Sequence, residues 1–155
     1  EDDADGPAAD EDEAEREWEV LLTLVHSMRE LLRIHSAAIV PTLEAQLLPA
    51  LDCWLAADGR HRAAALYVLA DLIEFGGVDA AKKYTLVALP QLAKAVTLGG
   101  ADEQVIVAAA AAGLGAVAEC GGKLFSRAAV ADAAKKLAVL LQAPDARCAA
   151  MAERT

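Results

Sequence analysis

The sequence predicts an all-α fold in which pairs of helices stack into a superhelix of about three repeats. Apolar residues recur at three- and four-residue steps along most of the chain, and the breaks between such segments fall at Gly or Pro. Two pairs of segments also share short motifs. Of the 155 residues 56% are hydrophobic and only 4% aromatic, so the core must consist largely of Ala, Leu and Val. Such small residues indicate closely spaced helices.

The chain opens with an acidic segment. Residues 1–19 contain eleven of the 24 acidic residues against one basic residue, Arg16, so they carry the whole net charge of −10. Residues 1–16 hold Gly6 and Pro7 but no large apolar side chain, and they cannot bury enough surface to offset the entropy of ordering. We expect residues 1–16 to be a disordered acidic tail or loop, either a solubilising linker or an arm that attracts basic partners.

Seven helices are expected after this segment. The first is amphipathic, with Trp18, Val25 and Leu32 on one stripe. The second opens at Pro41, which suits a first helical turn because the missing N–H would have no partner there. The third, fourth and fifth each stop at a Gly-Gly pair, which is a common helix terminator. The expected bounds are 17–35, 41–55, 60–75, 79–98, 102–120, 126–142 and 144–155.

Two motifs recur at a similar distance along the chain. Leu48-Pro49 in the second helix reappears as Leu89-Pro90 in the fourth, 41 positions later. A Glu-x-Gly-Gly ending begins at Glu74 in the third helix and at Glu119 in the fifth, 45 positions later. Repeats of 40–47 residues made of helix pairs are typical of HEAT and armadillo solenoids. Each Leu-Pro proline lies on an outer stripe, and we expect it to bend its helix.

The fifth helix is apolar on every side from Val105 to Ala118. In a helix of a water-soluble fold this pattern indicates neighbours on more than one face, so we expect this helix at the centre of the stack. Gly113 and Gly115 each lower helix propensity by roughly 1 kcal/mol relative to Ala. A close approach of neighbouring helices can offset that cost.

Several classes of function lack support in the sequence. The apolar run 105–118 is shorter than the roughly 20 residues that span a bilayer, so we expect no membrane segment. The chain starts with Glu and has no signal-peptide pattern, and we expect a fragment of a longer protein. The three Cys and three His lack zinc-ligand spacing, so no metal or cofactor is expected. There is no basic stripe for nucleic acid and no nucleotide-binding or nucleophile motif, so we expect no direct nucleic-acid binding and no enzyme activity.

Three consecutive segments carry a resemblance to a known family. They are "LYVLADLIEFGG" with Asp71 and Glu74, "YTLVALPQLAKAV" with Leu89-Pro90, and "AAAAGLGAVAECGG" with Gly113, Leu114 and Gly115. Their order and spacing resemble consecutive HEAT helices of the importin-β (karyopherin-β) superfamily, nearest the large import receptors for ribosomal proteins and histones. Residues 1–55, an acidic stretch followed by a helix and "LLP", are also similar to that class.

The resemblance implies a segment of a nuclear transport receptor that works in the cytoplasm, the nucleus and the nuclear pore. Receptors of this class bind protein cargo and the GTP-bound form of Ran mainly with their inner helices. They bind phenylalanine-glycine nucleoporins between their outer helices. An alternative that the repeats leave open is a HEAT or armadillo scaffold subunit of a phosphatase or chaperone assembly.

One polar stripe is the candidate binding surface. Arg60, Tyr67, Asp71 and Glu74 share a face of the third helix by their spacing, and Glu119 takes the place of Glu74 on the fifth helix. We hypothesise that Asp71, Glu74 and Glu119 lie near one another on the concave side and attract a basic partner, with the acidic tail contributing. The alternative is that they form the solvated polar face that any surface helix needs.

Overall fold

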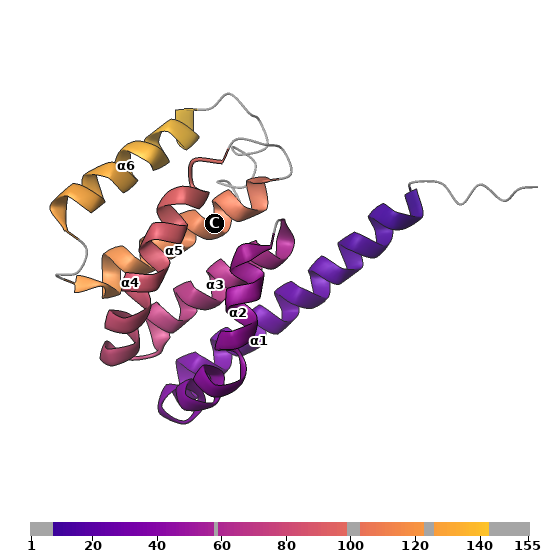
Figure 1. Ribbon diagram of the computed structural model, residues 1–155, viewed down its shortest axis with the longest axis horizontal. Coiled ribbons are helices and arrows are strands. Elements are labelled where there is room, and N and C mark those ends of the chain that lie inside the picture. Colours follow the sequence, from indigo (N-terminus) through magenta and orange to yellow (C-terminus); the bar gives the residue numbers. More distant parts are fainter. Residues whose placement is uncertain (1–7, 58, 99–102, 123–125, 143–155) are drawn as a thin grey trace, which may run out of the picture.

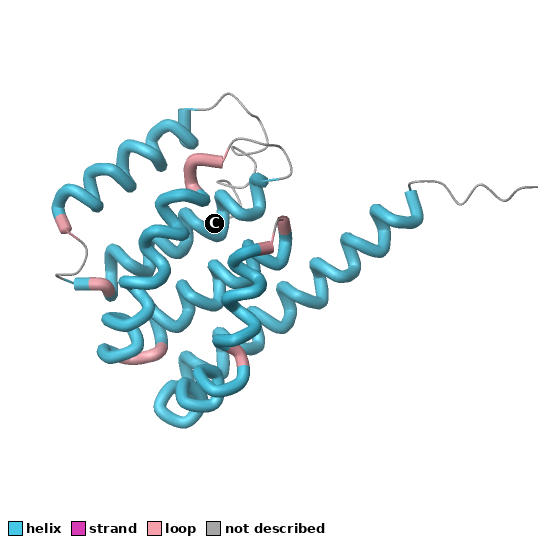
Figure 2. Tube along the Cα trace, in the orientation of Figure 1, coloured by secondary structure: helices cyan, strands magenta, loops and turns pink. Residues whose placement is uncertain are grey.

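The computed structural model describes residues 8–57, 59–98, 103–122 and 126–142 of the chain. Within these residues there are six helices and no strand, so the predicted all-α class is confirmed. The helices are joined by short loops where these are described (Figures 1 and 2). They are α1 (Ala8–Gln46), α2 (Leu48–Ala56), α3 (Arg60–Phe75), α4 (Val78–Ala95), α5 (Gln104–Cys120) and α6 (Arg127–Gln142).

Four helices follow the predicted bounds closely. Helix α3 matches the expected 60–75, and α4, α5 and α6 agree with the expected ranges within three residues at each end. Helix α4 ends early because Val96 and Thr97 form a turn before the Gly-Gly pair. The seventh expected helix, 144–155, lies outside the described residues.

Helix α1 is longer than the sequence analysis expects. Residues 8–16, which we expected in a disordered tail or loop, form its first turns, while residues 1–7 lie outside the described part. These turns are rich in Ala and Glu, which favour helices, and acidic side chains are stabilised at a helix N-terminus by the helix dipole. The expected end at residue 35 appears as a kink, because His35 has non-helical angles, φ −129° and ψ 32°.

The expected second helix, 41–55, is divided in the structure. Its first part continues α1 beyond the kink, so Pro41 lies inside a helix and does not open one. A turn at Leu47 then separates α1 from α2. Pro49 therefore sits in the first turn of α2, where its missing N–H costs little, and it does not bend an intact helix. Pro90, by contrast, lies inside α4 as expected.

The helices pack in two layers. Helices α1, α3 and α5 lie side by side in the first layer, with α3 in contact with both of the others. In the second layer, α2 packs mainly against α3, α4 packs against α3 and α5, and α6 packs against α5. The N-terminal half of α1 projects beyond the other helices (Figure 1).

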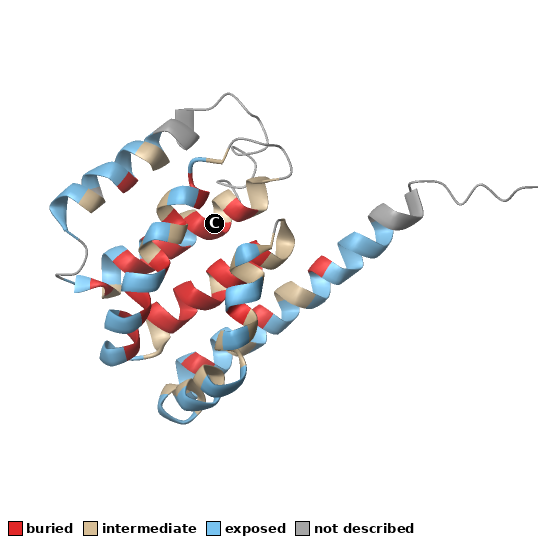
Figure 3. Ribbon diagram, in the orientation of Figure 1, coloured by how far each residue is buried: buried red, intermediate tan, exposed pale blue. Residues whose placement is uncertain are grey.

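The core is centred on α3 and not on α5. Helix α3 is buried on all sides along most of its length (Figure 3), and Ala63, Ala64 and Ala65 have no exposed surface. Helix α5 instead keeps one exposed face that includes Ala112, Gly115 and Ala118, so our expectation that it is the central helix is wrong. Apolarity did not distinguish the two positions because alanine and glycine on an exposed face cost little.

The two glycines inside α5 have different surroundings. A Cβ placed on Gly113 would lie 2.5 Å from Cδ2 of Leu92, so α4 approaches α5 closely at this position. A Cβ placed on Gly115 would have no atom within 4 Å. The expected close approach is therefore confirmed at Gly113 and is absent at Gly115.

Matched substitutions of these glycines should have different effects. We expect Gly113→Val to lower the free energy of unfolding by about 1–3 kcal/mol, because the added methyl groups overlap the Leu92 side chain. The control, Gly115→Val, should change it by less than about 0.5 kcal/mol, because that side chain enters solvent. Urea denaturation followed by circular dichroism measures both values. Equal losses in the two variants would contradict the close approach of α4.

Candidate functional site

Arg60, the first residue of the predicted stripe, is bound to α1. Its Nη2 lies 2.6 Å from Oε2 of Glu15, and its Nη1 donates to the backbone carbonyl of Ala14. Both partners lie in the part of the chain that we expected to be disordered. Arg60 therefore helps to fix the N-terminal half of α1 against α3, and it is engaged within the protein.

Arg29 of α1 is the main partner of the acidic residues on α3. One of its guanidinium nitrogens lies 3.6 Å from Asp71 Oδ1 and the other lies 3.5 Å from Glu74 Oε2. The guanidinium also lies over the Phe75 ring, 5.1 Å from its centroid. These separations exceed a good hydrogen bond, so the contact is mainly electrostatic. Arg29 was not predicted from the sequence, although it lies 45 positions before Glu74, the same interval as that of the repeated motif.

Asp71 is too buried to act as an open docking residue. Its side chain is only 6% exposed, whereas that of Glu74 is 31% exposed. Burial raises the pKa of Asp71 from 3.8 to about 6, Arg29 opposes this rise, and the negative charge of Glu74 adds to it. Because the folded protein holds this proton more tightly than the unfolded chain does, the stabilisation is complete below about pH 3.8. It is lost as the pH rises through about 6.

The variant Asp71→Asn tests this pKa, because it keeps the shape of the side chain and removes the titration. As the pH rises from 4 to 7.5, the wild type should lose stability relative to the variant by up to about 3 kcal/mol. Urea denaturation at several pH values measures the difference. If the two proteins keep a constant difference across this range, the raised pKa is contradicted.

Cys120 connects the acidic residues of α3 and α5. Its thiol approaches the Glu74 carbonyl oxygen, with the sulfur 4.0 Å away. Burial raises the pKa of the Cys120 thiol, and the charges of Glu74 and Glu119 raise it further. Glu119 acts on this thiol as its neighbour in the sequence, so the expected proximity of the Glu74 and Glu119 carboxylates stays a prediction. Glu119 is exposed, and Tyr67 is half-buried with its pKa raised by that burial.

A raised pKa makes Cys120 a poor nucleophile, because the thiolate is the reactive form. We expect Cys120 to react at least about tenfold more slowly with a disulfide reagent at pH 8 than Cys53, which is exposed. Rates are measured on two single-cysteine variants, Cys53→Ala/Cys148→Ala and Cys120→Ala/Cys148→Ala. Equal rates would show that neither burial nor the carboxylates protect Cys120.

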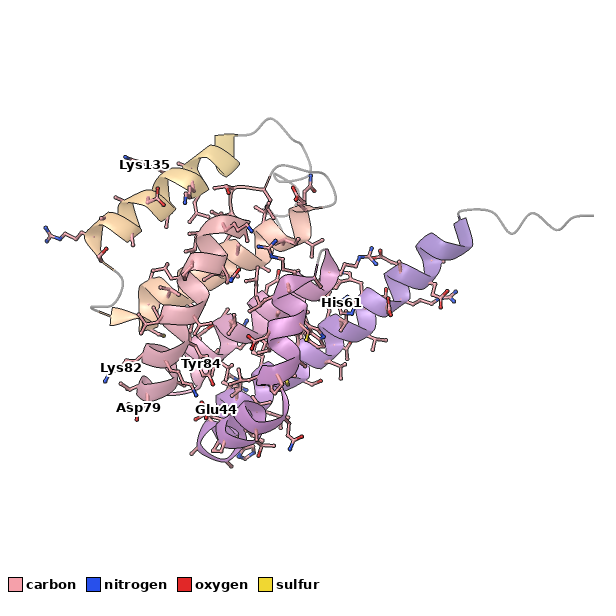
Figure 4. The ribbon with its side chains drawn as sticks, viewed as in Figure 1. Glu44, His61, Asp79, Lys82, Tyr84 and Lys135 are labelled. Atoms are coloured by element: carbon pink, nitrogen blue, oxygen red, sulfur yellow. The ribbon has the colours of Figure 1, made fainter. Side chains whose placement is uncertain are left out.

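A second polar cluster joins α1 to α4, and the sequence analysis did not predict it. The hydroxyl of Tyr84, a residue only 2% exposed, donates to Oε1 of Glu44 at 2.7 Å (Figure 4). Lys83 Nζ donates to the same oxygen at 2.8 Å. The Lys83 and Tyr84 hydrogen bonds lower the pKa of Glu44, and burial raises the pKa of Tyr84. The polar groups of these three side chains are paired with one another, so this cluster stabilises the packing of α1 against α4.

The described residues show no sign of a metal centre or a membrane span. They contain no group of three or more His, Cys, Asp or Glu side chains that could hold a metal ion. None of the helices in this part of the chain is long and apolar enough to cross a bilayer.

The sequence matches no known family model, and no curated protein or solved structure is significantly similar to it.

Proposed function

We propose that the chain is a non-enzymatic segment of a nuclear transport receptor whose HEAT-type helix pairs form part of a superhelix that binds protein cargo. The observation that supports it best is the similar interval, 42 to 46 positions, between contacting residues of neighbouring helices in the first layer. Glu15 contacts Arg60 and Arg29 contacts Glu74, each 45 positions apart, and Cys120 contacts Glu74, 46 positions away. Equal intervals between successive helices of one layer are what stacked repeats produce.

Contacts that involve the second layer have a similar interval. Glu44 of α1 contacts Tyr84 of α4, 40 positions later, and Lys136 Nζ of α6 donates to the Ala93 carbonyl oxygen of α4, 43 positions earlier. Residues in contact thus lie about the same number of positions apart in both sets of helices. This interval favours the HEAT and armadillo class over a bundle of unrelated helices. Within that class, the sequence resemblance of the α3 to α5 segments favours the import receptors.

Glu74 and Glu119 are the residues through which we propose that a basic cargo segment binds. Glu119 is exposed and has no ion pair with any described residue, and Glu74 shares Arg29 with Asp71. Lysine or arginine side chains of a cargo would add positive charge where two carboxylates, Asp71 and Glu74, share one guanidinium. The resemblance implies two further partners, Ran in its GTP-bound form and phenylalanine-glycine nucleoporins, and a location in cytoplasm, nucleus and nuclear pore.

A lysine-rich peptide tests the cargo surface. The variant Glu74→Gln/Glu119→Gln should lower its affinity by about threefold to tenfold at low salt, because two exposed attractions are lost. It should also reduce the salt dependence of binding. The charge-matched control is Glu30→Gln/Asp132→Asn, whose carboxylates pair with Arg33 and Lys136 within their own helices. Fluorescence anisotropy measures the affinity of the peptide for both variants. An equal loss of affinity in the control would contradict binding at Glu74 and Glu119.

Binding to Ran distinguishes a transport receptor from a scaffold subunit. We expect the chain to be retained by immobilised Ran loaded with a non-hydrolysable GTP analogue and not by Ran loaded with GDP. The two samples differ only in whether the bound nucleotide carries a γ-phosphate. Equal or absent retention on both would argue against a receptor segment and for a scaffold of the phosphatase or chaperone kind.

A further inference from the structure

Helix α1 has a second apolar face that no described residue covers. Trp18, Val25 and Leu32 bury one side of this helix in the core. Four large side chains point away from that core, and their steps of four, seven and three residues place them on one stripe. Their exposed fractions are 59% for Val20, 56% for Leu24, 46% for Leu31 and 60% for Ile34. We call these four residues the outer stripe.

The polar groups within the outer stripe do not need water. Thr23 Oγ1 donates to the Glu19 carbonyl oxygen at 2.8 Å, and Ser27 Oγ donates to the Thr23 carbonyl oxygen at 2.8 Å. Because both hydroxyls are satisfied within α1, a partner can cover them without leaving a buried donor unpaired. Ser27 also keeps the centre of the stripe small, so a second helix can approach there.

The corresponding faces of α3 and α5 are both covered by helices. The interval of 45 residues relates Val20 and Leu24 to Ala65 and Leu69 of α3, which are 0% and 2% exposed. On α3 this face lies towards α2, whose Trp54 ring contacts His61 with the centroids 6.0 Å apart. The same interval leads on to Ala110 and Leu114 of α5, 0% and 3% exposed, on the face where Leu92 of α4 approaches Gly113.

We propose that the outer stripe is a docking site for a basic, alanine-rich amphipathic helix of a partner, which occupies on α1 the place that α2 and α4 occupy on α3 and α5. Two observations determine this chemistry. The stripe consists of bulky branched side chains, which interdigitate best with small ones, and α4, which covers the corresponding face of α5, buries Ala80, Ala81 and Ala88. The assignment does not depend on the proposed transport function.

Charge at one end of the stripe favours a basic partner. Glu13, Arg16 and Glu17 line an open hollow together with Val20. No ion pair joins these three charged residues to the rest of the described chain, and carboxylates outnumber the guanidinium. A lysine or arginine near the end of the docked helix would meet the excess negative charge.

A peptide copy of residues 78–95 is a suitable probe, because it carries Lys82, Lys83 and Lys94 together with the alanine-rich face of α4. We expect saturable binding of the labelled peptide to the full chain, measured by fluorescence anisotropy. The variant Leu24→Glu/Leu31→Glu should weaken it at least tenfold. The variant Leu86→Glu/Val87→Glu, which places the same charges on exposed apolar residues of α4, should leave it unchanged. Glu13→Gln/Glu17→Gln should reduce its salt dependence.

Two outcomes would overturn the proposal. The first is no saturable binding, or an equal loss in the α4 variant. The second is a sedimentation result in which the chain self-associates, Leu24→Glu/Leu31→Glu abolishes this association, and the peptide does not compete with it. The outer stripe would then be an interface between two copies.

A Leu92→Glu peptide, which disrupts the apolar face of the probe without altering the protein, should fail to bind.

Discussion

The packing of α3 between α1 and α5 is the constraint on which the rest of the structure depends. Three consecutive alanines, Ala63, Ala64 and Ala65, are fully buried there, so neighbouring helices can approach α3 from several directions. Leu66, Leu69 and Leu72 fill the spaces between them. A core with so few aromatic residues depends on close packing of small and aliphatic side chains, and the Leu92 side chain of α4 accordingly packs directly on Gly113.

This packing also determines which charges remain available. Because α1 lies beside α3, Arg29 reaches Asp71 and Glu74, and burial makes the charged form of Asp71 costly. The acidic stripe is thus not a uniform negative surface. Its inner member is partly neutralised and shielded from solvent, while Glu74 and Glu119 can interact with solvent or a partner. Any electrostatic recognition at this surface depends mainly on these two residues.

Helix α1 differs from α3 and α5 in having a second apolar face that none of the described residues covers. The ion pair between Arg60 and Glu15 and the contacts of Arg29 hold one face against α3. On the other face, Val20 and Leu24 correspond to buried residues of α3 and α5, but none of the described residues covers them. A shared sequence interval can therefore produce equivalent surfaces in different states of burial, and the uncovered one is where a partner can bind.

The sequence by itself determined the helical class, the bounds of α3 to α6 within three residues and the interval between the shared motifs, because periodicity, Gly-Gly breaks and motifs are local signals. It also placed Arg60, Asp71 and Glu74 on one face of α3, since i to i+4 geometry follows from the helix alone. Local signals failed where competing preferences were nearly balanced. In residues 8–16, the helix propensity of Ala and Glu outweighed the expected disorder. At Leu47, a turn separates two helices where a single bent helix was expected. Only the tertiary structure decided that α3 is central, that Arg29 neutralises Asp71 and that Tyr84 binds Glu44. These contacts join residues 40 to 45 positions apart, and the relative placement of whole helices controls them.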